Sequence, residues 1–256
     1  MIELEAGDVQ AEVSAVDGGR IARLVIAGFD LLVTSGPSTT PLHWGCYPMV
    51  PWAGRLRHGR FEHEGRTIAM PIDMPPNAIH GTGYTSAWEV RDQGIDFVEL
   101  DVGLEWPLGG RAHQHLQLTP DALVCVLTAI AGHDSMPVTL GWHPWFVKPV
   151  SDHLVFDAYY PCDDEQIPTG ELAPPPERPW DHCFVGPSLP LELVYANGLR
   201  VSVESDCDHW VVYDQRSYAT CVEPQSGPPN ALDMGRAQVL QPGEMLQRTM
   251  TVRWQR

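Results

Sequence analysis

The stretch PVTLGWHPWFVK, residues 137–148, indicates both the architecture of the chain and its chemistry. Its first half alternates as a half-buried β-strand does. Proline lacks an N–H and holds the residue before it extended, so we expect Pro144 to end this strand and to leave His143 at the strand end. Trp142 and Trp145 flank that imidazole, and aromatic faces suit the C–H faces of a sugar ring. A histidine there can transfer protons near neutral pH. A core histidine is the alternative, and the rest of the chain has to decide between the two.

Short segments of alternating hydrophobicity follow one another along the whole chain, separated by turn residues. The 23 glycines and 24 prolines supply that punctuation, and no window of a dozen residues carries a clean helical repeat. Many short strands at this spacing are typical of an antiparallel sandwich or barrel. No linker divides the sequence, so we expect a single domain over residues 1–256. The expected strands are 9–16, 20–26, 29–34, 60–70 (a hairpin), 88–91, 97–104, 111–118, 122–131, 153–159, 191–195, 199–204, 210–213, 219–222 and 246–254.

The chain is strongly acidic. Its 33 Asp and Glu residues against 16 Lys and Arg residues give a formal net charge of −17, and its hydrophobic content of 43% is that of an ordinary globular protein. An acidic surface repels phosphate backbones and anionic lipids. We therefore expect neither nucleic acid nor a membrane among its partners, and the sequence makes no prediction about the oligomeric state.

The cysteines and the first residues bear on the compartment. The six cysteines are scattered without a Cys-x-x-Cys pair, whereas zinc sites and disulfide frameworks have tighter spacing. The opening decapeptide, MIELEAGDVQ, has no basic start and no apolar signal core. We expect reduced thiols in a cytoplasmic protein. His113 and His115 share a strand face, which suits a metal pair, but Arg111 lies on that face and no Glu follows at the usual distance. We therefore predict no metal site.

Four further stretches place a polar side chain next to proline, glycine or an aromatic residue. Each is a weak signal alone. In the last of them, proline is expected to end the strand that carries the glutamate. The stretches are PMVPWAGRLRHGRF (48–61, with Arg55), NAIHGTG (77–83, with His80), RPWDHCF (178–184, with Asp181) and CVEPQSGPPN (221–230, with Glu223).

Taken in order, these motifs resemble those of the aldose 1-epimerase (galactose mutarotase) family. The order is Ala-Gly-Arg, Asn-x-x-His-Gly, His-Pro-Trp-Phe and Glu-Pro-x-Ser-Gly, over residues 48–230. The resemblance implies an all-β fold, a large two-sheet antiparallel β-sandwich of the galactose mutarotase-like type, with the site in a groove across one sheet. It also implies an isomerase of carbohydrate metabolism.

The resemblance assigns roles position by position. His143 matches the general acid of the family and Glu223 its general base. The expected sugar-binding residues are Arg55 (the arginine that binds hydroxyls), His80 (the second histidine of the site), Asp181, Asn77 and Trp142.

The chemistry of anomer exchange requires such a set of groups. Opening the hemiacetal removes the proton of the anomeric hydroxyl and protonates the ring oxygen, and the aldehyde then rotates and closes on its other face. A base and an acid must bracket one carbon, and each is worth roughly 10²–10⁴-fold. Mutual attraction is expected to keep Glu223 a carboxylate and His143 an imidazolium. The reaction needs no metal and no cofactor.

Three alternatives stay open. A non-catalytic sugar-binding sandwich would keep the aromatic residues and Arg55 without needing His143 and Glu223 together. A glycoside hydrolase or lyase would need two carboxylates at the bond, and Glu223 and Asp181 are the candidates. An epimerase of a phosphorylated hexose would want a basic pocket, against which the net charge argues mildly.

Overall fold

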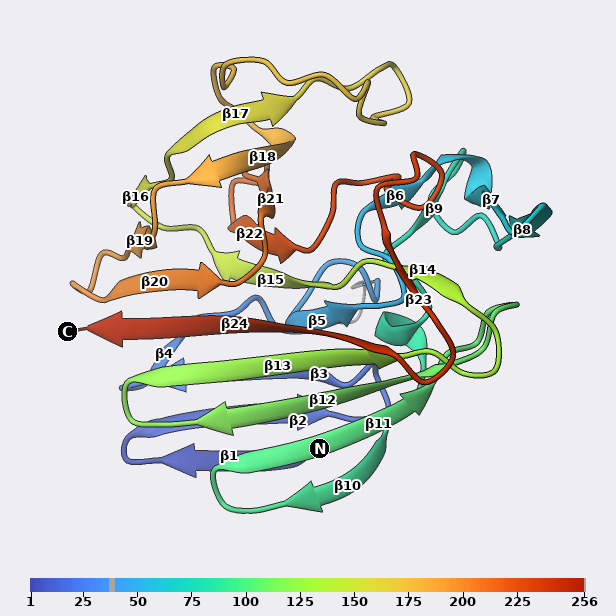
Figure 1. The fold of residues 1–256 in the computed structure, drawn as a ribbon. Helices are drawn as coiled ribbons and strands as arrows, with labels where there is room; N and C mark the ends of the chain where they lie inside the picture. The colour runs from blue at the N-terminus through green and yellow to red at the C-terminus, as the bar shows by residue number, and fades with distance from the viewer. Residues whose placement is uncertain (37–39, 256) are drawn as a thin grey trace.

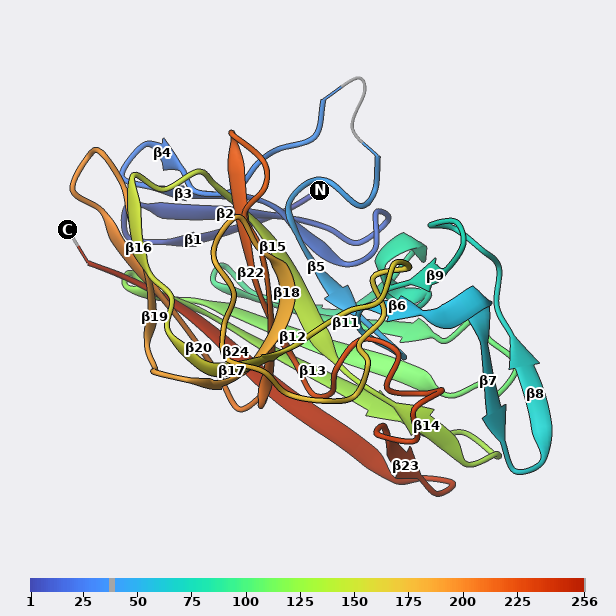
Figure 2. The same cartoon turned by 90° about the horizontal axis from the view of Figure 1, so that it is seen from above.

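The computed structural model of the protein describes residues 1–36 and 40–255, and nearly all of its regular structure is β-strand. Within the described residues the helical turns are two short 3-10 segments, Arg57–Gly59 and Gly83–Thr85. Two large antiparallel sheets lie one over the other, with β10–β13 and β24 in front of β1–β5 in Figure 1 and the same layers seen from above in Figure 2. The predicted all-β two-sheet sandwich is confirmed.

The larger sheet has ten strands and contains the first strand of the chain, whereas the last strand belongs to the second sheet. Its order is β1-β2-β3-β5-β15-β22-β21-β18-β17, and β4 pairs with β3. The strands are β1 (Ile2–Ala6), β2 (Val9–Ser14), β3 (Arg20–Ile26), β4 (Phe29–Asp30), β5 (Cys46–Met49), β15 (Gly141–Val147), β17 (Phe156–Tyr160), β18 (Asp181–Pro187), β21 (His209–Tyr213) and β22 (Ala219–Gln225).

The second sheet has eight strands, in the order β10-β11-β12-β13-β24-β20-β19-β16. Three small two-stranded sheets, β6–β9, β7–β8 and β14–β23, complete the fold. The strands of the second sheet are β10 (Glu89–Gln93), β11 (Phe97–Gly103), β12 (Arg111–Leu118), β13 (Ala122–Ile130), β16 (Ser151–His153), β19 (Leu191–Val194), β20 (Arg200–Ser205) and β24 (Met245–Gln255). The remaining strands are β6 (Arg55–Leu56), β7 (Arg60–His63), β8 (Arg66–Ala69), β9 (Ala78–Ile79), β14 (Met136–Val138) and β23 (Gln238–Leu240).

Strand periodicity builds the core between the sheets. Along β12 buried and partly exposed residues alternate, so that Leu116 and Leu118 point inward. Leu24 and Ile26 of β3 in the other sheet belong to the same buried cluster. Strands with one wet face carry this alternation in their sequence, which is why 111–118 and 122–131 were predicted closely.

Three central strands of the larger sheet are different, because they are covered on both faces. Every residue of β5 and β22 is buried, as is every residue of β15 except the last. On the outer face a second apolar cluster includes Tyr47 of β5, Trp145 of β15 and Tyr84 from the second 3-10 turn. Loops and turns therefore cover the outer face of the middle of this sheet. Side chains at the bottom of a cleft between them would be shielded from water.

Two predicted strand ends are wrong, because β15 continues through Pro144 and β22 continues through Pro224. Between these strands the ladder pairs Gly141 with Gln225 and resumes only at residues 145 and 221. Both prolines lie in the unpaired interval between these two strands, where a residue without a backbone N–H costs no hydrogen bond of this ladder.

Other predicted strands differ in extent. The segment 29–34 contains only β4, and 153–159 divides between β16 and β17, which belong to different sheets. The hairpin at 60–70 is confirmed as β7 and β8. Strands β5 and β18 were not predicted, because burial on both faces or irregular composition removes the alternating pattern.

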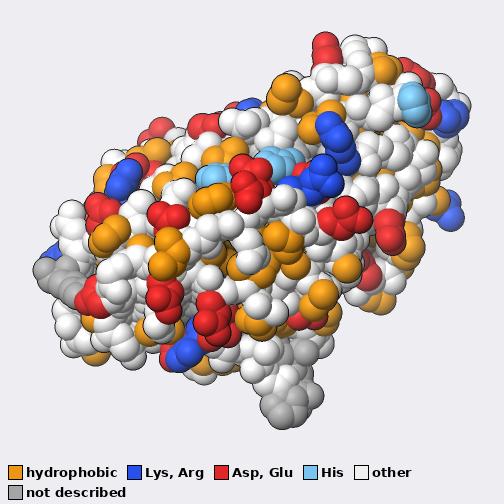
Figure 3. Space-filling model, turned by 90° about the horizontal axis from the view of Figure 1, so that it is seen from below, with side chains coloured by type: hydrophobic (Ala, Val, Ile, Leu, Met, Phe, Trp, Pro, Cys, Tyr) orange, Lys and Arg blue, Asp and Glu red, His pale blue; other side chains and the backbone are white. Residues whose placement is uncertain are grey.

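The charged surface follows the composition. On the face drawn in Figure 3, acidic side chains are spread widely, while histidine and basic side chains lie beside one another near the centre. All six cysteines are free. None of the described residues forms a helix long and apolar enough to cross a membrane.

Candidate active site

The described residues line a cleft of about 760 Å³, its open mouth included, over the central strands of the larger sheet. Into it project His143 from β15, Glu223 from β22, Asp181 from the start of β18, Arg55 from β6 and His80 just after β9. The structure thus brings together five of the seven predicted site residues. A cleft of this size is suited to a small ligand.

His143 and Glu223 are direct neighbours across two antiparallel strands. The register pairs Gly141 with Gln225, and two residues further along each strand it sets His143 opposite Glu223. Their Nε2 and Oε1 atoms are 3.3 Å apart, and the two side chains are only 9% and 3% exposed. A potential proton donor and a potential acceptor therefore share one dry corner of the cleft.

Aromatic rings enclose the His143 imidazole. Tyr47 lies opposite it on β5 with ring centroids 4.9 Å apart, and Trp145 stacks on it at 5.3 Å with an interplanar angle of 8°. Burial among these rings, and secondarily the nearby His43, lowers the pKa of His143 to about 3. The ring is consequently neutral at neutral pH.

Burial acts on Glu223 in the opposite sense. Loss of water, followed by the negative charge of Asp181, raises the pKa of Glu223 well above its usual value, while Arg55 and a hydrogen bond from Gln225 Nε2 (3.3 Å) oppose that rise. The sequence predicted that imidazolium and carboxylate would keep each other charged. The structure favours a neutral pair in the unliganded protein, because desolvation of both groups outweighs their attraction.

His80 is held by a tight backbone arrangement. The ring Nδ1 of His80 accepts a hydrogen bond from the backbone N–H of Gly54 (3.2 Å), and the backbone N–H of His80 donates to the Gly54 carbonyl (3.0 Å). Nδ1 is therefore an acceptor, and the neutral ring carries its proton on Nε2. Burial, then His143 and Arg55, lowers the pKa of His80 well below its usual value and keeps it neutral.

Glycines make this arrangement possible. Gly54 and Gly81 both have positive φ, and a Cβ on Gly81 would lie 2.1 Å from the carbonyl oxygen of Val50. His80 itself has a φ of 59°, a sparsely populated region for a residue with a side chain. The Gly residues of Ala-Gly-Arg and His-Gly therefore serve to seat His80.

Arg55 and Asp181 form an ion pair on one wall of the cleft. The Arg55 Nη2 to Asp181 Oδ2 distance is 3.5 Å, and each side chain is about a quarter exposed. Both keep hydrogen-bonding capacity that faces the cleft, since guanidinium has five N–H donors and carboxylate about four acceptor sites.

Trp142 lies outside the cleft, contrary to the sequence prediction. Successive residues of a strand point to opposite faces, so Trp142 points away from His143 and is fully buried in the core between the sheets. The ring that flanks His143 in the cleft is Trp145, two residues on.

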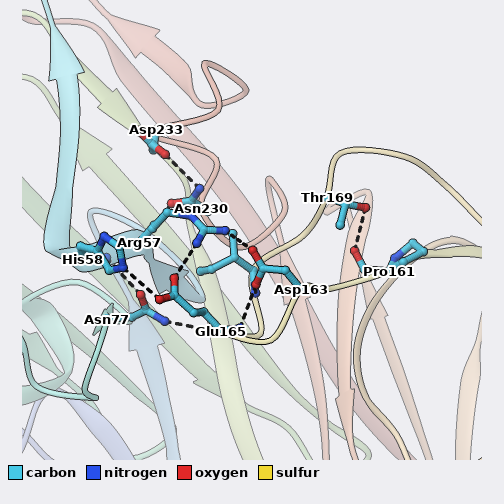
Figure 4. A network of polar contacts seen from close by, with 10 residues as sticks. Arg57, His58, Asn77, Pro161, Asp163, Glu165, Thr169, Asn230 and Asp233 are labelled. Carbon is cyan, nitrogen blue, oxygen red and sulfur yellow. Dashed lines mark hydrogen bonds and ion pairs between the residues drawn. The ribbon is translucent and has the colours of Figure 1, made fainter.

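Asn77 also lies outside the cleft, in a polar network beside it (Figure 4). Its Oδ1 accepts the N–H of His58 (3.0 Å) and its Nδ2 donates to the carbonyl of Glu165 (3.1 Å). In the same network Arg57 pairs with Glu165 (2.5 Å) and with Asp163. Asn77 therefore joins the segment after β6 to the loop between β17 and β18, which is a structural role.

Several cleft residues were not predicted. Gln225 follows Glu223 by two positions on a strand, so alternation was a signal for it. Tyr47, Tyr213 and Arg216 come from segments that carried no motif, and only the sheet order brings them to the cleft.

One set of side chains could supply ligands to a metal ion. Ligand atoms of His143, Cys221 and Glu223 lie within 4.8 Å of one another. The fit is poor, because metal ligands must be deprotonated and burial raises the pKa of the Cys221 thiol well above its usual value. His113 and His115, where the sequence predicted no metal site, contact carboxylates: His113 Nδ1 lies 2.6 Å from Asp101 and His115 Nδ1 lies 3.4 Å from Glu99.

The fold is a two-sheet antiparallel sandwich with a cleft over its larger sheet, and solved structures of this fold are known. A galactose mutarotase-like protein from Clostridium acetobutylicum superposes with a TM-score of 0.88 at 19% identity, over 99% of this chain and 94% of that one. A putative aldose 1-epimerase from Escherichia coli K12 gives 0.85 at 22% identity, over 99% and 98%. At these identities the likeness establishes the fold.

Sequence relatives establish the family. The aldose 1-epimerase family model matches residues 1–253, so the chain belongs to the aldose 1-epimerase family, a family of isomerases. The uncharacterized Escherichia coli protein YihR is 25% identical over 91% of this chain and 86% of its own length. Uncharacterized YphB from the same organism is 28% identical over 66% of this chain but 60% of its own length. Mouse galactose mutarotase is 30% identical over 48% of this chain and 40% of its own length.

Proposed function

We propose that the protein is an aldose 1-epimerase that interconverts the α and β anomers of a free sugar by opening and reclosing the ring. The observation that carries this proposal is the placement of His143 opposite Glu223, 3.3 Å apart, at the buried floor of a cleft. Family membership agrees with the reaction class. Neither side chain has an evident structural reason to be there, because burying a titratable pair costs stability.

The reaction needs one proton shared by the pair. Opening takes a proton from the anomeric hydroxyl and gives one to the ring oxygen, and closure on the other face reverses both transfers. One residue must therefore begin protonated and the other unprotonated. The neutral pair of the empty cleft, with a protonated Glu223 and an unprotonated His143, already holds that single proton.

We assign the anomeric proton to Glu223 as base and the ring oxygen to His143 as acid. In the empty cleft the proton is on Glu223, and the 3.3 Å contact allows its transfer to His143. A hydroxyl that donates to Glu223 favours the carboxylate, and Arg55 already acts in that direction. Sugar binding thus prepares the acid and the base together.

The remaining cleft residues would hold the sugar in place. The N–H donors of Arg55 and the acceptor oxygens of Asp181 suit vicinal hydroxyls, and the Nε2–H of His80 offers a further donor. Trp145 presents an aromatic face to the C–H side of the ring. Fixing the anomeric carbon between the pair in this way supports the proton transfers.

Anomer exchange measured by saturation-transfer NMR tests the proposal. We expect the protein to accelerate exchange for at least one sugar in a panel of common hexoses, pentoses and their 6-phosphates. Binding of a sugar without faster exchange would instead favour a non-catalytic carbohydrate-binding protein. Release of free sugar from a glycoside would favour a hydrolase.

A further inference from the structure

We infer that the sugar carries a negatively charged group, a phosphate or a carboxylate, and that Arg216 at the mouth of the cleft binds it. This inference rests on the proposed reaction, anomer exchange at a free anomeric hydroxyl, and narrows the class of substrate from free sugars in general to those that also carry an anionic group. It starts from an arginine that lines the cleft and that neither the family motifs nor the acid–base chemistry uses.

Arg216 is free to receive an anion. It lies in the short connection between β21 and β22 and is exposed to solvent. Over residues 1–36 and 40–255 no carboxylate forms an ion pair with it, and its guanidinium carbon lies over the ring of Tyr213, 5.9 Å from the ring centroid. Arg55, the other arginine of the cleft, is by contrast paired with Asp181.

The charges that line the cleft leave one positive charge in excess. Arg55 and Asp181 cancel, burial holds Glu223 near neutrality, and His143 and His80 are neutral. The remaining charged residue is Arg216. In a chain of net charge −17, a cleft with a net positive charge is a local exception. Guanidinium matches phosphate and carboxylate through two parallel hydrogen bonds.

Arg216 is also at the right end of the cleft. A series of rings leads outward from His143 through Trp145 (5.3 Å) to Tyr213 (6.0 Å), and Arg216 lies over Tyr213. An anion on Arg216 is therefore separated from the reacting carbon by the width of these rings. An anionic group at C6, the exocyclic carbon on the other side of the ring oxygen from the anomeric carbon, meets this requirement.

Nearby histidine does not compete for the role. His43 lies edge-on to Trp145 at 5.4 Å, and burial together with the charge of Arg216 lowers its pKa. His43 is thus a neutral neighbour that can form hydrogen bonds, and Arg216 is the residue that would balance the charge of the anion.

The test compares a neutral sugar with its charged derivatives. Anomer exchange and equilibrium binding of glucose, glucose 6-phosphate and glucuronate are measured for the parent, for Arg216→Gln and for Arg216→Glu. Arg91→Gln, which removes an exposed arginine on β10, is the matched control. Glucose 6-phosphate and glucuronate separate a phosphate from a carboxylate as the preferred anion.

We expect the parent to favour at least one anionic sugar over glucose in kcat/KM. Arg216→Gln should lower that preference by about 10-fold or more, mainly through KM, as loss of a charge-assisted hydrogen bond does. Arg216→Glu should lower it further, and Arg91→Gln should leave it unchanged. An unaltered preference in both Arg216 variants, or a parent that prefers glucose to both anions, overturns the inference.

The binding measurement separates this inference from the proposed function. Anion binding that depends on Arg216 without any anomer exchange would contradict the epimerase and support the anion site. Exchange of sugars with no dependence of the preference on Arg216 would support the epimerase and contradict the anion site.

Discussion

His143 Nε2 lies 3.3 Å from Glu223 Oε1, and each residue faces the other across a break in the ladder between two central strands. The break is where Pro144 and Pro224 lie. The register of the two strands therefore places the two side chains side by side. The aromatic rings that exclude water from them determine which of the two is protonated.

The first prediction concerns pH. The pair is active with one proton, so the acid limit of kcat/KM reflects a second proton on His143 and the alkaline limit reflects loss of the proton. Because the pKa of His143 is lowered to about 3 and that of Glu223 is raised, we expect a broad bell with no acid limb near the usual histidine value of 6.5. Nitrogen-15 NMR of the free protein should show a neutral His143 ring through that pH. An imidazolium that titrates near 6.5 would contradict the account.

A second prediction links activity to stability. Burial raises the pKa of Glu223 in the folded state, so above pH 4.5 the native state keeps a proton that the unfolded chain releases. The free energy of unfolding therefore decreases as pH rises above 4.5. Glutamine does not ionise, so Glu223→Gln removes this decrease in the free energy of unfolding. We expect the variant to be more stable than the parent at alkaline pH, by about 1 kcal/mol or more. The gain should shrink as pH falls toward 4.5. Denaturant unfolding measures it, with exposed Glu89→Gln as control, and a destabilised variant at all pH values would count against the burial argument.

The third prediction concerns Arg55. Arg55→Ala removes a donor to sugar hydroxyls and leaves Asp181 without its partner. We expect weaker sugar binding and slower turnover together, from a charge-assisted hydrogen bond worth about 1.5–3 kcal/mol. Titration calorimetry and exchange kinetics measure the two effects, and Arg60→Ala, on the exposed β7 hairpin, is the control. Unchanged kinetics in a folded Arg55→Ala protein would remove Arg55 from the site.

A fourth prediction is that anomer exchange requires no metal ion. The ring-opening chemistry uses two proton-transfer groups, and the thiol that would complete a metal set with them is held protonated by burial. Dialysis against a chelator should leave the rate unchanged. Loss of the rate, followed by its recovery with one divalent ion, would show that the assignment of roles is incomplete.

Sequence reasoning was most accurate where strands have one wet face. The segments 111–118 and 122–131 alternate because one side of each strand meets the core, and they match β12 and β13 closely. Strand β5 is buried on both faces and includes Pro48, so no period of two is visible in it. The same double burial creates the dry site, and local pattern is therefore least informative near the chemistry.

The site was predicted by motif and corrected by geometry. His143, Glu223, Arg55, His80 and Asp181 do meet in one cleft. Adjacency in sequence misplaced Trp142, because neighbouring strand residues face opposite ways. Adjacency also misplaced Asn77, whose amide is engaged by a polar network beside the cleft.

No sequence pattern pointed to Arg216, since a free arginine in a turn looks like any solvated residue. Its position in the cleft follows from the order β15-β22-β21 in the sheet. The positive charge at the mouth of the cleft therefore depends on the order of the strands, and the acidic composition of the chain gives no indication of it.

The most direct test of the central claim is the rate of anomer exchange in variants of the acid–base pair. Glu223→Gln cannot accept the anomeric proton and His143→Asn cannot donate as imidazolium, so we predict that each lowers turnover by roughly 10²-fold or more while the protein stays folded and binds sugar. The double variant should be little worse than the poorer single one, because the two residues act as one unit. Glu99→Gln and His113→Asn, on the opposite sheet, should retain the parent's rate. If both single variants exchange anomers as fast as the parent, His143 and Glu223 are not the catalytic pair and the account is wrong.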